Sequence, residues 1–130
     1  MTPAAGFLTF LCVTLVCLGG VVVTGRAAKR KAHLSWVAGA VVGLGVTIYF
    51  AEGLGERYDL EAAGWIYPFH LLLAKVTTGS YLVVVGSGVA TIKQSSHRKT
   101  HSRIAYSVLF LTVLTAITGA SMLLAATPLA

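Results

Sequence analysis

The sequence has few charged residues. Only 11% of its 130 residues are charged, whereas 56% are apolar. A soluble chain of this length would lack the polar surface needed to cover itself, so the composition excludes an ordinary soluble domain and indicates a lipid environment. The net charge of +6 requires no nucleic-acid partner, because basic loops beside a membrane are attracted to the anionic lipid leaflet.

Cysteine is also scarce, with Cys12 and Cys17 as the only two. They are five residues apart in one apolar stretch, so on a helix their side chains would be rotated by about 140° from each other. This spacing excludes a disulfide or a shared metal site within that helix. We therefore assign both cysteines to apolar packing.

The sequence does contain four long apolar stretches. Each is close to the ~20 residues with which a helix crosses a bilayer, and none shows the strict alternation of a barrel strand. They are Phe7–Thr24, Leu34–Ala51, Tyr67–Ile92 and Ile104–Ala126. The loops between them are too short to fold alone, so we expect a single domain over residues 1–130. It would be an all-α integral membrane protein, an up-down-up-down bundle of four transmembrane helices.

The loops differ in charge. Basic residues gather in the first and third loops, and all four acids lie between the second and third apolar stretches. By the positive-inside rule, the basic loops are cytoplasmic, and the acidic loop and both termini are outside. Residues 1–6 lack the basic segment of a secretory signal, so we expect the first helix to be retained in a multi-pass protein of the bacterial inner membrane.

Histidine carries the strongest functional signal. His33 opens the second apolar helix and His101 opens the fourth, both on the cytoplasmic side. Two imidazoles at one depth on facing helices are what a helix bundle needs to hold a haem by its axial positions. Arg30, Lys31 and Arg103 lie near that depth and are suited to neutralise the haem propionates.

A second histidine lies close to His101. His97 precedes it by four residues, so either could be the cytoplasmic ligand. If both were on one helix they could also chelate a metal, with His33 as a third ligand of a non-haem site.

We expect a further polar group at the outer side. Lys75 is the only charge well inside a span, where a lysine costs about 2.5 to 3.5 kcal/mol on insertion scales. A structural ion pair with Glu52 would offset this cost. The functional alternative is a quinone, proton or substrate site built from His70, Lys75 and Glu52.

The segments Arg-Lys-Ala-His33, Tyr-Pro-Phe-His70 and His97-Arg-Lys-Thr-His101, with Thr-Ala-Ile-Thr-Gly119 downstream, resemble the transmembrane b-type cytochromes of the b561 class. In that family, histidines on alternate helices pair across the bundle, one pair at each membrane face, and electrons pass from a donor on one side to an acceptor on the other. The resemblance implies haem b held by His33 and His101. It also implies that His70 is half of an outer pair, whose partner would lie one helix further on.

These patterns predict a small membrane-embedded haem protein that takes part in electron transfer with a quinone or a redox protein. If it is an enzyme, it would be an electron-transfer oxidoreductase component. One alternative is a non-enzymatic structural or assembly subunit, in a homo-oligomer or a larger membrane complex. The other is a small transporter that uses the outer polar group.

Overall fold

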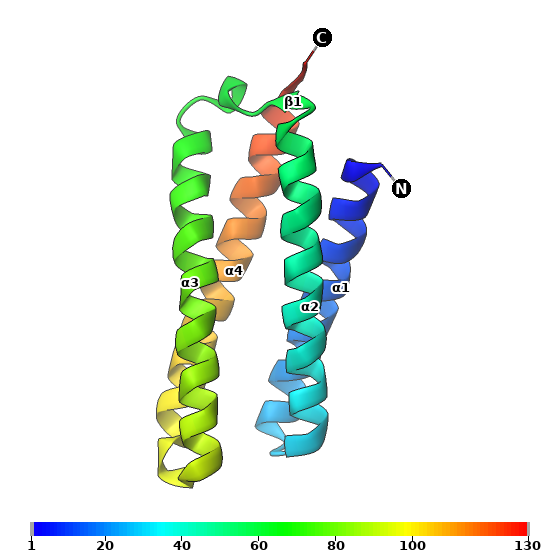
Figure 1. The fold of residues 1–130 in the computed structure, drawn as a ribbon. Coiled ribbons are helices and arrows are strands. Elements are labelled where there is room, and N and C mark those ends of the chain that lie inside the picture. The colour runs from blue at the N-terminus through cyan, green and yellow to red at the C-terminus, as the bar shows by residue number, and fades with distance from the viewer. Residues whose placement is uncertain (1, 130) are drawn as a thin grey trace. The chain divides into compact units, whose positions relative to one another are not determined.

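The computed structural model describes residues 2–129 as an all-α chain. Its four long helices are α1 (Pro3–Arg26), α2 (Arg30–Gly55), α3 (Ile66–Lys93) and α4 (Arg98–Ala125) (Figure 1). Two 3-10 turns, η1 (Glu61–Ala63) and η2 (Ser95–His97), and two paired two-residue strands, β1 (Tyr58–Asp59) and β2 (Thr127–Pro128), complete the chain. The predicted all-α class with four helices is confirmed.

All four helices are long and apolar enough to cross a membrane. Many large apolar side chains point outward; for example, Leu72 is 63% exposed, Leu82 78% and Phe110 68%. Helices that are apolar on their outer faces as well as their packed faces are typical of proteins solvated by lipid. The chain is therefore a multi-pass membrane protein whose helices contact the bilayer.

The helices are longer than the apolar stretches that predicted them. α2 begins at Arg30 instead of Leu34, and α4 begins at Arg98 instead of Ile104 and ends at Ala125. Once formed, a helix continues through basic residues, because each added residue gains a backbone hydrogen bond and long side chains reach water from the membrane edge. α1 begins earlier than expected, at Pro3, where the Thr2 hydroxyl accepts a bond from the Ala5 N–H at 3.3 Å and caps the helix.

The chain divides into two compact units. Unit 1 is Met1–Tyr58 with Pro128–Ala130, and unit 2 is Asp59–Thr127. Unit 1 contains the hairpin of α1 and α2, and unit 2 contains the hairpin of α3 and α4. Within each unit the short connection makes the two helices antiparallel (Figure 1). The expectation of a single domain stays a prediction.

A tight turn connects α1 to α2. The Ala28 N–H donates to the Gly25 carbonyl at 3.2 Å, and the Lys29 N–H donates to the Thr24 carbonyl at 3.0 Å. These are the two bonds of a Schellman motif, whose left-handed position is usually glycine. Here that position is Ala28, with φ of 54°. The turn determines where α2 starts, and therefore where His33 lies.

Glycines allow α1 and α2 to approach closely. A Cβ on Gly20 would overlap the Trp36 ring, and a Cβ on Gly43 would lie 2.7 Å from the Thr14 hydroxyl oxygen. Small residues at helix interfaces favour packing in membranes, where no hydrophobic effect drives two helices together.

Hydroxyl groups join α3 to α4. Thr77 and Thr115 are hydrogen-bonded at 2.9 Å, and Tyr81 and Thr112 at 2.8 Å. The hydroxyls of Thr112 and Thr115 already donate to carbonyls of α4. Thr77 and Tyr81 therefore donate across the interface.

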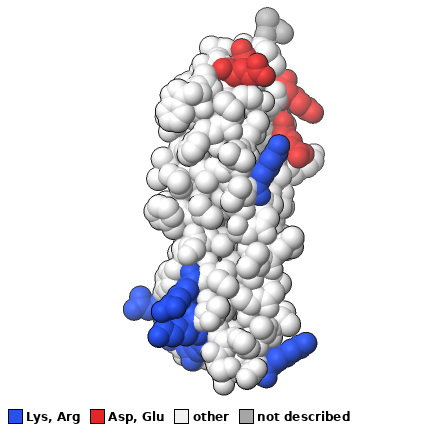
Figure 2. All heavy atoms as spheres, turned by 90° about the vertical axis from the view of Figure 1, so that its left-hand side faces the viewer, with Lys and Arg blue, Asp and Glu red and all other residues white. Residues whose placement is uncertain are grey.

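Charged residues lie toward the ends of each hairpin. In unit 1 four of the five bases lie around the α1–α2 turn, whereas the two acids and Arg57 lie at the far end of α2. In unit 2 the acids precede α3, and most of the bases surround the α3–α4 turn. In Figure 2 most of the visible bases lie away from the acids, but one base lies beside them. The predicted membrane orientation depends on this separation of bases from acids within each hairpin.

Candidate functional site

His33 lies in the first turn of α2 and packs against α1. Its Nδ1 is 3.0 Å from the Val21 carbonyl oxygen. A Cβ on Gly25 would be 3.2 Å from the imidazole. Because a carbonyl oxygen only accepts, Nδ1 carries the proton, and Nε2 carries the lone pair of the neutral ring.

His101 is held in the same way in the first turn of α4. Its Nδ1 is 2.8 Å from the hydroxyl oxygen of Ser87, and that hydroxyl donates to the Val84 carbonyl at 2.8 Å. The Ser87 oxygen therefore accepts from Nδ1, and Nε2 again carries the lone pair. The ring lies against Gly88, where a Cβ would be 3.3 Å from Cε1.

His97 is placed differently. It is the last residue of η2, just before α4, and its side chain is exposed. It is also the N-cap residue of α4, four residues before His101, and the chelating pair of these two histidines stays a prediction. Among residues 2–129 there is no group of three or more His, Cys, Asp or Glu that could hold a metal ion. Of the two candidates for the cytoplasmic ligand, the one held by the neighbouring helix is His101.

His70 is the third histidine packed against a neighbouring helix. Its Nδ1 is 3.0 Å from the Thr118 hydroxyl oxygen, and that hydroxyl donates to the Leu114 carbonyl at 3.0 Å. A Cβ on Gly119 would be 2.8 Å from the ring. An interhelical hydrogen bond from Thr118 is expected of a hydroxyl inside a span, but its pairing with His70 was not predicted, and the one signal for that pairing is the Thr-Gly119 pair in the segment that resembles the cytochromes.

The basic candidates lie beside the candidate ligands. Arg30 and Lys31 share the first turn of α2 with His33, and Arg103 follows His101 by two residues in α4. All three side chains are exposed. Their charges are thus available to an anionic group near these histidines.

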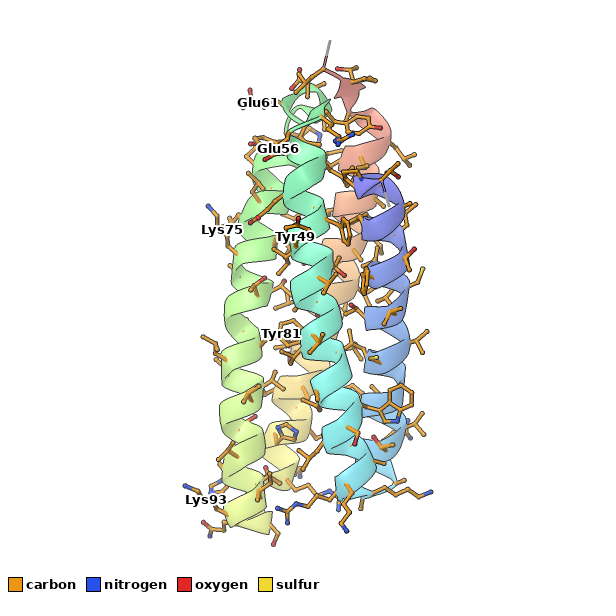
Figure 3. The ribbon with its side chains drawn as sticks, turned by 45° about the vertical axis from the view of Figure 1, so that its right-hand side comes forward. Tyr49, Glu56, Glu61, Lys75, Tyr81 and Lys93 are labelled. Atoms are coloured by element: carbon orange, nitrogen blue, oxygen red, sulfur yellow. The ribbon has the colours of Figure 1, made fainter. Side chains whose placement is uncertain are left out.

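The three predicted outer residues do not converge within one hairpin. Glu52 is exposed near the end of α2 in unit 1, whereas His70 and Lys75 belong to unit 2. His70 faces α4, while Lys75, five residues further on and therefore rotated by about 140°, is exposed and points outward from α3 (Figure 3). The outer polar site stays a prediction.

Comparison with known proteins found no matching family model, no matching characterised protein and no matching solved structure. The class of protein is therefore defined by the structure alone. The chain is a multi-pass helical membrane protein in which three histidines are fixed by hydrogen bonds to a neighbouring helix.

Proposed function

We propose that the protein binds a b-type haem with His33 and His101 as axial ligands and takes part in electron transfer. The observation that carries the proposal is the Nδ1 hydrogen bond of each ring, to the Val21 carbonyl and to the Ser87 hydroxyl. Histidines that bind metals usually donate the other ring N–H to such a partner, which fixes the ring orientation and makes the ligating nitrogen more basic. The residues therefore fit the cofactor that the resemblance implies.

The surroundings of the two histidines support the same proposal. Each ring occupies space left by a glycine of the adjacent helix, Gly25 or Gly88, so its position is set by packing as well as by a hydrogen bond. Arg30, Lys31 and Arg103 would pair with the two propionates of a haem, because guanidinium and ammonium groups form short, charge-assisted bonds to carboxylates.

A haem bound here would supply one-electron chemistry. The chain itself supplies ligation, an apolar environment and positive charge, which together set the reduction potential. We place the site near the cytoplasmic face of a bacterial inner membrane, because the basic turns lie beside both ligands. Electrons would pass between a cytoplasmic redox protein and membrane quinones.

The visible absorption spectrum of detergent-purified protein, expressed with ample haem, tests the proposal. After reduction with dithionite we expect the sharp α and β bands of a low-spin haem. His33→Ala and His101→Ala should each abolish these bands, whereas the exposed His97→Ala is the matched control and should retain them. A wild-type protein without bands, or bands unaffected by either ligand variant, would overturn the proposal.

A further inference from the structure

The sequence contains four dipeptides in which a hydroxyl residue precedes glycine. They are Thr24-Gly25, Thr78-Gly79, Ser87-Gly88 and Thr118-Gly119. Three of the four contact a histidine of the other helix in the same hairpin, and each contacts a different histidine. The recurrence of a hydroxyl–glycine pair beside three different histidines needs a physical reason.

The glycine of each pair brings the histidine ring close to the helix backbone. A Cβ would lie 3.2 Å from the ring at Gly25, 3.3 Å at Gly88 and 2.8 Å at Gly119. Even alanine would therefore push the ring outward by a few tenths of an ångström at each place. The glycine determines how deeply the imidazole lies.

In two of the pairs the hydroxyl accepts the proton of the ring. Ser87 and Thr118 donate to a carbonyl of their own helix, so their oxygens accept the histidine Nδ1–H directly. Thr24 donates to the Gly20 carbonyl at 2.6 Å and lies 3.4 Å from the Val21 carbonyl, the acceptor of His33. Because the Val21 carbonyl can only accept from His33, all three rings carry the proton on Nδ1.

We infer that these three hydroxyl–glycine pairs are positioning residues for His33, His101 and His70. The glycines set the ring positions, and the Ser87 and Thr118 hydroxyls, with the Val21 carbonyl that Thr24 also bonds, hold the Nδ1–H tautomer that leaves the lone pair on Nε2. The ligand role of His33 and His101 rests on the proposed haem function. The tautomer and the ring position do not, because they follow from contacts within each hairpin.

The two pairs nearest the basic turns recur in a shared sequence context. Val-x2-Thr-Gly25 in α1 corresponds to Val-x2-Ser-Gly88 in α3, and Arg-Lys-Ala-His33 in α2 corresponds to Arg-Lys-Thr-His101 in α4. The hydroxyl contact of Thr14 with Thr47, at 3.4 Å, corresponds to that of Thr77 with Thr115, at 2.9 Å. Each hairpin therefore has a hydroxyl–glycine pair and a histidine at corresponding positions near its basic turn, although the Nδ1 acceptor is the Val21 carbonyl in one and the Ser87 hydroxyl in the other.

The fourth dipeptide provides an internal control. Thr78 and Gly79 lie in α3, both are exposed, and a Cβ on Gly79 would meet nothing within 4 Å. Substitutions of Thr78 and Gly79 therefore make the same kinds of change in α3 as substitutions of Ser87 and Gly88, but without a histidine beside them.

Nitrogen NMR of haem-free protein labelled with ¹⁵N-histidine tests the inference, because protonated and unprotonated ring nitrogens have well-separated shifts. Ser87→Ala should move the proton of His101 from Nδ1 toward Nε2 and leave His70 unchanged, and Thr118→Val should do the reverse. Ser87→Thr and Thr118→Ser retain a hydroxyl and should retain the Nδ1–H signals, as should the control Thr78→Ala. The inference is wrong if His101 keeps its Nδ1 proton in Ser87→Ala, or if Thr78→Ala has the same effect.

The haem-loaded protein gives a second, separable readout. Ser87→Ala and Gly88→Ala should each weaken haem binding by about 10- to 100-fold, the usual effect of losing a partner that orients a metal ligand, and should shift the reduction potential. Gly79→Ala should change neither. Unchanged affinity and potential in both variants would overturn the positioning role while leaving the haem proposal intact. A wild-type protein that binds no haem but shows the expected tautomers would overturn only the haem proposal.

Discussion

Replacing Ala28 by glycine should stabilise the α1–α2 hairpin. Ala28 has φ of 54° in the Schellman turn, a left-handed conformation that costs an L-residue roughly 1–2 kcal/mol. Glycine removes that strain but loses about 0.4–1 kcal/mol through the greater freedom of the unfolded chain. The net gain should be about 0.5–1 kcal/mol in the free energy of unfolding.

Unfolding by dodecyl sulfate in mixed micelles, followed by helical circular dichroism, measures this difference. Ala27→Gly is the matched control, because Ala27 has φ of −76° and ψ of 0° and carries no left-handed strain. The control should lose about 0.4–1 kcal/mol, so the two neighbouring substitutions should have opposite signs. A destabilisation of Ala28→Gly equal to that of Ala27→Gly would refute the account of the turn.

Three further predictions concern helix packing and insertion. Gly20→Ala should lower the free energy of unfolding by about 1–3 kcal/mol, because the added methyl group overpacks against Trp36. In Gly19→Ala the added Cβ meets nothing within 4 Å, so the free energy of unfolding should be unchanged or rise by up to ~1 kcal/mol through helix propensity. Equal effects of the two substitutions in the same micelle assay would contradict this. Tyr81→Phe removes one donor to α4 and should cost about 0.6 kcal/mol, and at most about 1.7; a larger loss would mean that the ring itself moves. Lys75→Leu should increase the fraction of α3 inserted in a glycosylation-mapping assay, because a lysine in the span disfavours insertion by up to about 3.5 kcal/mol; reduced insertion would show instead that the charge has a partner.

The four spans could be predicted because a helix in lipid must be about 20 residues long and apolar, and each of these stretches meets both conditions. The helix ends could not, because Arg30 and Arg98 continue a helix as readily as they end an apolar run. The choice between His97 and His101 could not be made from the sequence either, because it depends on contacts across the hairpin. Ser87 of α3 lies 2.8 Å from His101 Nδ1, whereas His97 is exposed at the N-cap of α4.

The residues that position the histidines were not predicted for a different reason. Thr24-Gly25 and Ser87-Gly88 are 63 residues apart, whereas His33 and His101 are 68 residues apart. The difference arises because α3 continues to Lys93, well beyond Gly88, whereas α1 ends at Arg26, directly after Gly25. A comparison of the two halves at one fixed offset therefore matches either the glycines or the histidines, but never both. The contacts across each hairpin make the correspondence visible.

The central claim is that His33 and His101 together hold one haem. The most direct test is the molar ratio of haem to protein in detergent-purified samples, measured for the wild type and for the His33→Ala, His101→Ala and His97→Ala variants at matched helical content. The account predicts equal amounts of haem and chain in the wild type and in His97→Ala, and a loss of that haem in each of the other two. Full haem content in either His33→Ala or His101→Ala, or a haem-free wild type, would contradict it.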